Sequence, residues 1–194
     1  FYKLLSDVPP LTILAHRTLW SAVRGAFVKG CKKDHFRIVH FSVQGMHIHF
    51  ICEASSRRAL SRGVQGAKIR MARAINNACK RRGTVFADRY HERIITNPTQ
   101  CRHTIAYVLN NQRHHAAAEG ASYPRNRVDP CSSATYFTGW TIERPRPWGE
   151  LCAALPVAAP VAAPKSWLLR IGWRRAGGPI SPTRVPGVPP GQPT

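Results

Sequence analysis

Acidic residues are scarce in this sequence. Its 194 residues include 9 Asp and Glu against 29 Lys and Arg, which gives a formal net charge of +20 with neutral histidines. A charge this lopsided argues for a polyanionic partner, either nucleic acid or an anionic membrane surface. The hydrophobic content of 43% argues against a wholly disordered chain. Charge alone leaves open whether the protein only binds the polyanion or also cuts it.

Long apolar runs and closely spaced cysteines are also lacking. No run approaches the roughly 20 apolar residues that a membrane-spanning helix needs, so the sequence excludes a spanning protein and favours an extended polyanion as partner. The six cysteines lie about 20 to 30 residues apart without a CxxC pair, unlike those of zinc modules and dense disulfide frameworks. We therefore expect free thiols and a cytoplasmic protein. No export signal is evident, although the chain begins with Phe1 and we expect an N-terminal part to be missing.

Prolines are rare in the first part of the chain and crowded in the second. Only three of the 16 prolines precede residue 120. Because proline removes a backbone donor and interrupts regular elements, this shift predicts a domain edge. We expect a compact domain over 1–118, an extension over 119–155 that packs on it, and a tail over 156–194. The tail would hold a Pro/Ala-rich linker, a short helix and a disordered end from Pro179.

The first part alternates patterns that are typical of strands and helices. We predict strands over 1–5, 36–43, 47–53 and 90–96, and helices over 17–31, 56–82 and 97–115. Asn97, Pro98 and Gln100 form a helix-start signature, with the asparagine as N-cap. The resulting order predicts an α+β fold, a ferredoxin-like split βαβ sheet with an added C-terminal helix, followed by a proline-rich irregular tail. We expect the first strand to be truncated, because the chain begins inside it.

The triplet His47-Ile48-His49 falls in a predicted strand. In a strand, residues i and i+2 project from the same face, so both imidazoles point one way and Ile48 points the other way. Two imidazoles on one rigid face can hold a divalent metal, and a neighbouring oxygen ligand could complete the site. Two surface histidines are the alternative. The triplet alone leaves both interpretations open, because the sequence holds nine histidines.

Tyr107 lies in the helix predicted over 97–115. At about 100° per residue, the apolar side chains of this helix share one side, which should face the sheet. Tyr107 and Asn111 are spaced i, i+4 and lie together off that stripe. We therefore expect an exposed tyrosine with an amide one turn away. Taken alone, this pair is equally compatible with an ordinary surface tyrosine.

The two motifs make chemical sense together. A phenol is a poor nucleophile near neutral pH because its ordinary pKa is about 10, and a metal that polarises a phosphate lowers the demand on the nucleophile. The helix with Tyr107 follows the last predicted strand, so it can pack on the sheet face that displays His47 and His49. Attack on phosphorus would give a covalent phosphotyrosine and divide strand cleavage and rejoining into two steps.

These motifs carry a resemblance to a known family. The chain resembles the HUH single-tyrosine transposases, closest to the REP-associated tyrosine transposase branch. The matching segments are VHFSVQGMHIHFICEA (39–54), RRGTVFADRYHERIITNPTQCRHTIAYVLNNQRHH (81–115) and, more loosely, VDPCSSATYFTGW (128–140). A His-hydrophobic-His triplet followed by Tyr-x-x-x-Asn at this separation is specific, whereas either half alone is weak.

The resemblance implies a metal-dependent transposase, an enzyme that cleaves and transfers single-stranded or hairpin DNA. By this likeness His47 and His49 would bind Mg²⁺ or Mn²⁺, with Asn111 as a third, amide ligand. Tyr107 would attack the DNA and leave a 5′-phosphotyrosine and a free 3′-OH. The alternatives are a non-catalytic DNA-binding protein derived from such an enzyme, and a nucleic-acid metallohydrolase without a covalent step. Whether the chain forms a homodimer is left open.

Basic residues concentrate between the two motifs. We expect a cationic stripe that tracks DNA phosphates, and a solvated helix face is the alternative. The residues assigned to this predicted DNA track are Arg57, Arg58, Arg62, Lys68, Arg70, Arg73, Arg81, Arg82, Arg89 and Arg93.

Overall fold

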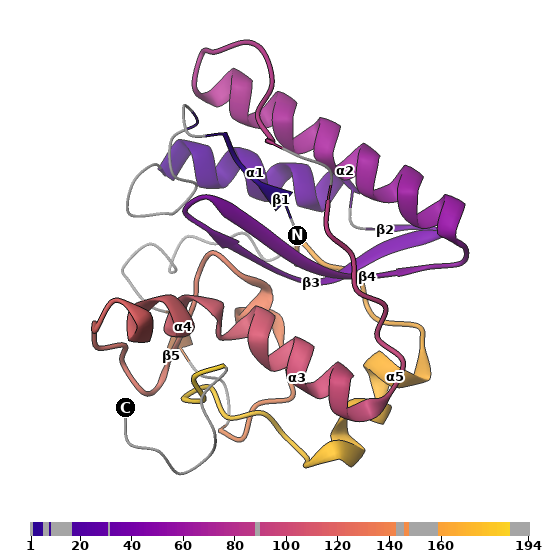
Figure 1. Cartoon of the computed structure of the whole chain (residues 1–194), viewed down its shortest axis with the longest axis vertical. Coiled ribbons are helices and arrows are strands. Elements are labelled where there is room, and N and C mark those ends of the chain that lie inside the picture. The colour runs from indigo at the N-terminus through magenta and orange to yellow at the C-terminus, as the bar shows by residue number, and fades with distance from the viewer. Residues whose placement is uncertain are drawn as a thin grey trace.

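The elements of the chain form three layers, with a sheet between two layers of helices (Figure 1). The structure is a computed structural model, and it describes residues 2–5, 8, 17–30, 32–87, 90–142, 146–147 and 159–186. The described strands of the main sheet are β1 (Tyr2–Lys3), β2 (Lys32–Lys33), β3 (Phe36–Gln44) and β4 (His47–Ala54), paired antiparallel in the order β1-β4-β3-β2. Helices α1 (Arg17–Gly30) and α2 (Arg57–Ala78) cover one face of the sheet, and α3 (Pro98–Leu109) covers the other.

The hairpin of β3 and β4 determines which side chains reach each face of the sheet. Ser42 lies opposite His49, and Gln44 lies opposite His47. Residues directly opposite each other in an antiparallel pair share a face. Strand alternation then sends Ile48 to the α1–α2 side, where its side chain is fully buried. The α3 side therefore receives both histidines together with Ser42 and Gln44.

Two apolar cores lie on opposite sides of the sheet. On the α1–α2 side the rings of Phe27 and Phe41 stack with their centroids 4.3 Å apart, and Met71 packs in the same cluster. On the α3 side Ile51 of the sheet packs with Ile105 of the helix. Burial of each large apolar side chain contributes about 1.5 to 3 kcal/mol. The apolar stripe of α3 therefore holds this helix against the face that carries the histidines.

The predicted α+β fold class is confirmed, but one predicted strand is wrong. Residues 90–95 have no regular structure. Phe86 instead forms an antiparallel bridge with Leu4, the residue that follows β1. Backbone hydrogen bonds of Val85 and Ala87, each 3.0 Å long, extend this pairing. Val85 and Phe86 are buried in the α1–α2 core, and their burial outweighs the alternating pattern of the later residues. The short segment thus lies beside β1, where a split βαβ sheet places its last strand.

Helix α2 is shorter than the sequence predicts. It begins after Ser56, whose Oγ accepts a hydrogen bond from Ala59 N at 3.1 Å, and it ends at Ala78 rather than near residue 82. Lys80 has a positive φ of 50°, which is outside the helical region and turns the chain away from the helix axis.

The helix predicted over 97–115 starts at the expected place but is interrupted. Asn97 is the N-cap of α3, and its Oδ1 accepts from Gln100 N at 2.9 Å. Gln100 Oε1 in turn accepts from Thr96 N at 3.1 Å, which completes a reciprocal cap. Asn110 has φ −104° and ψ 19°, and a second helix, α4 (Asn111–Ala118), follows it. The break changes the direction of the chain just before Asn111.

The C-terminal part packs beneath α3 and α4. Its described elements are β5 (Arg127–Val128), η1 (Ser133–Tyr136), β6 (Arg146–Pro147), α5 (Trp167–Arg170) and η3 (Gly172–Ala176). Ile180 is fully buried, and the carbonyl oxygens of Pro179 and Pro182 accept hydrogen bonds from Arg102 and Arg113 at 3.0 and 2.9 Å. The disorder predicted from Pro179 onward is therefore wrong for residues 179–186. Proline lacks a backbone donor but keeps its carbonyl acceptor, which the arginines use.

The other predictions about the later part of the chain stay predictions. They include the domain edge near residue 118 and the disorder of residues 187–194, which lie outside the described residues. No helix in the described ranges is long and apolar enough to cross a membrane. Within the same ranges Cys52, Cys79, Cys101 and Cys131 are free thiols, as expected, whereas Cys31 and Cys152 lie outside them.

Candidate active site

His47 and His49 lie on the sheet face that α3 covers. Their ring centroids are 6.4 Å apart. Burial, with smaller contributions from the charges of His47 and His115, lowers the pKa of His49 to about 4. Burial also lowers the pKa of His47, and the charges of His115 and Lys3 lower it further. Both imidazoles are therefore neutral near pH 7 and keep a nitrogen lone pair that can bind a metal.

Tyr107 lies on α3 beside the histidine pair. Its side chain is 37% exposed, as the sequence predicted for a residue off the apolar stripe. The ring meets the His49 ring edge-on, with centroids 5.5 Å apart and an angle of 81° between the planes. On its other side the ring centroid of His114 is 6.0 Å away. The structure thus brings His47, His49 and Tyr107 into one cluster that is open to solvent at the tyrosine.

Asn111 occupies a buried position one turn beyond Tyr107. It is the first residue of α4 and is 0% exposed. Both its Oδ1 and its Nδ2 have no hydrogen-bond partner among the described residues. A buried amide without partners costs about 1 to 3 kcal/mol per polar group, so it requires an explanation. No hydrogen bond to a described residue links Asn111 to the histidine pair, and only its position along the helix relates it to Tyr107.

The donor types of His47, His49 and Asn111 suit a divalent metal, which the family resemblance implies. Among the described residues, no group of three His, Cys, Asp or Glu side chains is arranged to hold a metal ion. Two neutral imidazoles and an amide oxygen form a different donor set, which suits several divalent ions. The unpartnered amide of Asn111 can supply the oxygen of this set. The fit therefore depends on a buried amide and not on an acidic cluster.

Sequence reasoning places His114 on the same polar helix face as Tyr107 but gives neither His114 nor His115 a role in the candidate site. Their rings are 5.8 Å apart, and His114 contacts Tyr107 while the charge of His115 reaches His47 and His49. Both follow Tyr107 by seven or eight residues, which is two helical turns. That spacing is the signal that could have identified them. The cluster around Tyr107 therefore contains four histidines among the described residues.

A buried carboxyl group lies under the same face of the sheet. Asp129 Oδ2 accepts hydrogen bonds from Gln44 Nε2 at 2.8 Å and from Ser42 Oγ at 3.4 Å, and Oδ1 accepts from Cys131 N at 2.7 Å. Burial raises the pKa of Asp129 to about 7, even though these three hydrogen bonds lower it. Ser42 and Gln44 are the strand partners of the two histidines, so this network supports the strand positions that carry them. No role for Asp129 was predicted from the sequence.

Most residues of the predicted DNA track lie on helix α2 or in the segment that follows it. Helix α2 lies on the opposite side of the sheet from the histidine pair (Figure 1). Arg57 pairs with Glu92 at 3.8 Å, and Arg81 donates to the Thr84 carbonyl at 3.2 Å. Three further track residues, Arg58, Arg62 and Arg70, line a pocket, and Lys68 lies over the Phe86 ring. Arg73, Arg82 and Arg93 are exposed, and Arg89 lies outside the described residues.

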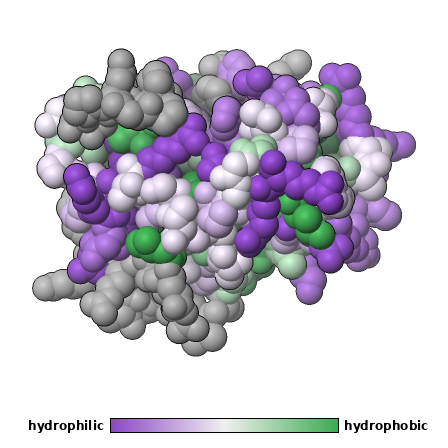
Figure 2. Space-filling view, turned by 90° about the horizontal axis from the view of Figure 1, so that it is seen from below, coloured by the Kyte–Doolittle hydropathy of each residue, from purple (hydrophilic) through white to green (hydrophobic). Residues whose placement is uncertain are grey.

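The face on the side of α3 and α5 is mainly hydrophilic. Figure 2 shows this side from below, and the apolar residues visible on it form separate small patches among hydrophilic ones. A large apolar patch would indicate a protein or membrane interface, and the described part of this face shows none.

The comparison with protein families supports the resemblance found in the sequence. The family model described as "Transposase IS200 like" matches residues 13–111, about half of the chain. The matched range contains His47, His49, Tyr107 and Asn111, which supports the HUH single-tyrosine type, while the REP-associated branch stays a prediction. Neither curated proteins nor solved structures gave a match to the chain. On the strength of the family match, the chain belongs to the IS200-like transposases.

Proposed function

We propose that this transposase cleaves and rejoins single-stranded or hairpin DNA with Tyr107 as the nucleophile and with the help of a divalent metal. The family supports transposition and a DNA partner in general terms. The observation that carries the finer proposal is the edge-on contact of the Tyr107 and His49 rings, 5.5 Å apart. A phenol beside an imidazole pair, exposed at the surface, can reach a phosphate that lies against both.

The proposed reaction exchanges one phosphodiester for another. Tyr107 Oη attacks the scissile phosphorus and forms a P–O bond, while the bond from phosphorus to O3′ breaks. The phenolic proton passes to a base, and O3′ takes up a proton and leaves as a 3′-OH. The DNA on the other side stays attached as a 5′-phosphotyrosine. Attack by a 3′-OH on this ester then restores the tyrosine and joins the strands, so that no net hydrolysis occurs.

His114 is the proposed base for the phenolic proton. Its Nδ1 is 2.9 Å from the Pro186 carbonyl oxygen. A carbonyl can only accept a hydrogen bond, so Nδ1 carries the ring proton and Nε2 keeps its lone pair. The ring centroids of His114 and Tyr107 are 6.0 Å apart, so the imidazole lies beside the phenol. The C-terminal segment thus selects the tautomer that can accept the proton.

His47, His49 and Asn111 are the proposed ligands of Mg²⁺ or Mn²⁺. When bound, such an ion polarises a phosphate oxygen and stabilises negative charge on it. The lowered pKa values of the two histidines support their neutral, ligating form. Asn111 supports the proposal through its buried amide, which lacks another partner among the described residues.

The test follows the covalent intermediate. The protein is incubated with Mn²⁺ and a hairpin oligonucleotide labelled at its 3′ end, and the label is expected to move with the protein on a denaturing gel. A label at the 5′ end is expected on a released strand that ends in a 3′-OH. Tyr107→Phe should abolish the adduct, whereas Tyr123→Phe, which removes a hydroxyl bonded to Gln112 outside the cluster, should leave it intact.

Each other outcome contradicts the proposal in a distinct way. An adduct formed by Tyr107→Phe would show that another residue is the nucleophile. Tight DNA binding by the wild type without any adduct would identify a non-catalytic DNA-binding protein. Multiple rounds of cleavage by Tyr107→Phe would identify a metallohydrolase without a covalent step.

A further inference from the structure

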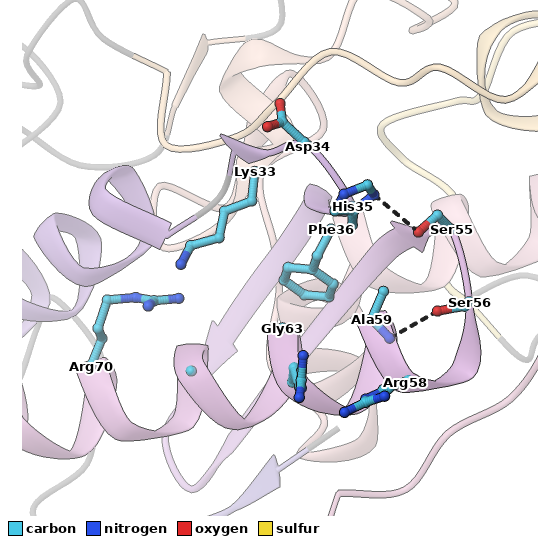
Figure 3. A pocket seen from close by; sticks show the side chains of 12 residues that line it. Lys33, Asp34, His35, Phe36, Ser55, Ser56, Arg58, Ala59, Gly63 and Arg70 are labelled. Carbon is cyan, nitrogen blue, oxygen red and sulfur yellow. Dashed lines mark hydrogen bonds between the residues drawn. The ribbon is translucent and has the colours of Figure 1, made fainter.

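A cationic pocket lies at the far end of the β3–β4 hairpin from the candidate active site. It has a volume of about 620 Å³ and lies between the N-terminal part of α2 and the turn that joins β2 to β3. Lys33, Arg58, Arg62 and Arg70 give it four cations, and Asp34 is the one acid among its lining residues. Figure 3 shows Lys33 and Arg70 extending toward the same space, whereas the Asp34 carboxylate points away from them.

The spacing of residues along α2 builds this cationic pocket. Arg58, Arg62 and Arg70 follow one another at multiples of four residues, with Gly66 in the gap, and therefore share one face of the helix. A Cβ at Gly66 would be 3.3 Å from Arg70 Nη1, so the missing side chain leaves room for that guanidinium. Gly30 at the end of α1 does the same, because a Cβ there would overlap the Arg70 guanidinium. The two glycines hold Arg70 close to the backbone of both helices.

The positive charge of the pocket is not neutralised within the described chain. None of its four cations forms an ion pair with a described residue, since the ion pairs there join Arg37 to Glu53 and Arg57 to Glu92. Arg70 Nε is buried and has no hydrogen-bond partner among the described residues. The N-terminus of the 22-residue helix α2 adds partial positive charge at the same place. An anion in the pocket would relieve the repulsion among these groups.

The lining also limits which anion fits. Phe36 lies in the pocket but is only 3% exposed, because its ring packs on Gly63, so it offers no face for stacking a base. The pocket instead offers guanidinium groups, an ammonium group and the hydroxyls of Ser55 and Ser56. Guanidinium groups bind phosphate through paired hydrogen bonds. We propose that this pocket binds phosphates of the DNA backbone, without regard to sequence, as a second contact of the DNA that the proposed function places at Tyr107.

The distance between the two sites sets the length of DNA that can use both. Ser55 at the pocket comes just after β4, six residues after His49, and a strand rises about 3.3 Å per residue, so the two residues are about 20 Å apart along the strand direction. The two sites also lie on opposite sides of the sheet. Duplex DNA advances about 3.4 Å per base pair, so a flank of about six base pairs or more is needed to reach the pocket.

The experiment compares two double variants of equal charge. Arg58→Gln/Arg62→Gln removes two cations of the pocket, and Arg73→Gln/Arg82→Gln removes two exposed cations that do not line it. Binding to hairpins with short and long duplex flanks is measured in EDTA over a range of salt concentrations. For the long flank we expect the pocket variant to bind about tenfold more weakly than the wild type, and to the same extent for unrelated sequences. The slope of log K against log salt concentration should become shallower by about one to two. For the short flank the pocket variant should bind like the control.

Equal loss in both double variants, or loss that does not depend on flank length, would overturn the proposal. Inorganic phosphate is the probe for a free anion. If millimolar phosphate stabilises the wild type but not the pocket variant against heat, while both bind DNA equally well, the pocket holds phosphate and not DNA. Adduct formation is measured separately, with Mn²⁺ and saturating protein. A missing adduct with flank-dependent binding would contradict the proposed function alone, and an adduct with flank-independent binding would contradict the pocket alone.

Discussion

Asp129 should make the stability of the protein fall as the pH rises through the weakly acidic range. Burial raises its pKa from 3.8 to about 7, against the smaller lowering effects of the hydrogen bonds from Cys131 N, Gln44 and Ser42. The folded protein therefore keeps this proton up to about pH 7, whereas the unfolded chain releases it near about pH 4. Because the folded state binds more protons between these values, the contribution is complete below about pH 4 and lost above about pH 7.

The expected magnitude follows from the pKa difference. A rise from 3.8 to about 7 corresponds to about 4 kcal/mol in the free energy of unfolding. Asp129→Asn keeps one acceptor oxygen and has no proton to release, so it should lose this pH dependence. Urea unfolding between about pH 4.5 and 8 measures it. The difference between variant and wild type separates Asp129 from His40 and His49, whose lowered pKa values act in the opposite direction.

The variant should gain stability relative to the wild type by about 3 kcal/mol across that range, since the part of the effect below about pH 4.5 is not covered. Glu119→Gln, which changes an exposed acid just after α4, is the matched control for the loss of one carboxylate. A difference between Asp129→Asn and the wild type that stays flat from pH 4.5 to 8 would refute the reasoning, because it would mean that Asp129 is ionised throughout.

Two further predictions concern the proposed base and the packing of α2. His114→Ala should slow formation of the DNA adduct about 100-fold with partial rescue by added imidazole, while His103→Ala, an exposed histidine one turn before Tyr107, should leave the rate unchanged; equal rates in both variants would exclude His114 as the base. Gly63→Ala should lower the free energy of unfolding by about 1 to 3 kcal/mol, because the added Cβ overlaps the Phe36 ring, and this exceeds the helix propensity gain of about 1 kcal/mol. Gly25→Ala, with nothing within 4 Å of the added Cβ, should instead stabilise by about 0.5 to 1 kcal/mol, and urea unfolding that ranks the two the other way would contradict the packing of α2 on β3.

Local patterns predicted the parts of the fold that depend on neighbouring residues. The start of α3 at Asn97 follows from a side chain that satisfies a backbone donor three residues later. The common face of His47 and His49 follows from strand alternation alone. The strand predicted at 90–96 failed because alternation does not specify a partner. The edge of β1 pairs with Phe86, and this choice depends on burial against helices distant in the sequence.

Within the candidate site, helix and strand periodicity relate residues that are close in sequence. The i, i+4 spacing relates Tyr107 to Asn111 in the sequence, although the break at Asn110 separates α3 from α4. Asp129 could not be found in this way. Its connection to the histidine strands runs through Ser42 and Gln44, more than 80 residues earlier, and through a loop whose hydrogen bonds leave no periodic signal.

For a related reason, the side of the sheet on which the predicted DNA track lies could not be read from the sequence. Charge density along the sequence does not say which side of the sheet a helix covers, and α2 packs on α1, away from the histidine pair. The same pattern nevertheless contained the pocket, because Arg58, Arg62 and Arg70 already share a helix face at four-residue spacing. The sequence pattern does not show that the turn between β2 and β3 brings Lys33 to that helix face.

The position of Tyr107 depends on segments beyond the part of the chain that matches the family. The match ends at residue 111, yet Arg113 donates to the carbonyl oxygens of Tyr123, Pro124, Arg127 and Pro182, at 2.9 to 3.3 Å. Each hydrogen bond from a charged group contributes about 1.5 to 3 kcal/mol, and a partly buried guanidinium left without these acceptors would be costly. The loop before β5 and the proline-rich segment therefore fix α4 together. Since α4 follows α3 after one residue, they also fix the distance between the tyrosine and the histidine face of the sheet.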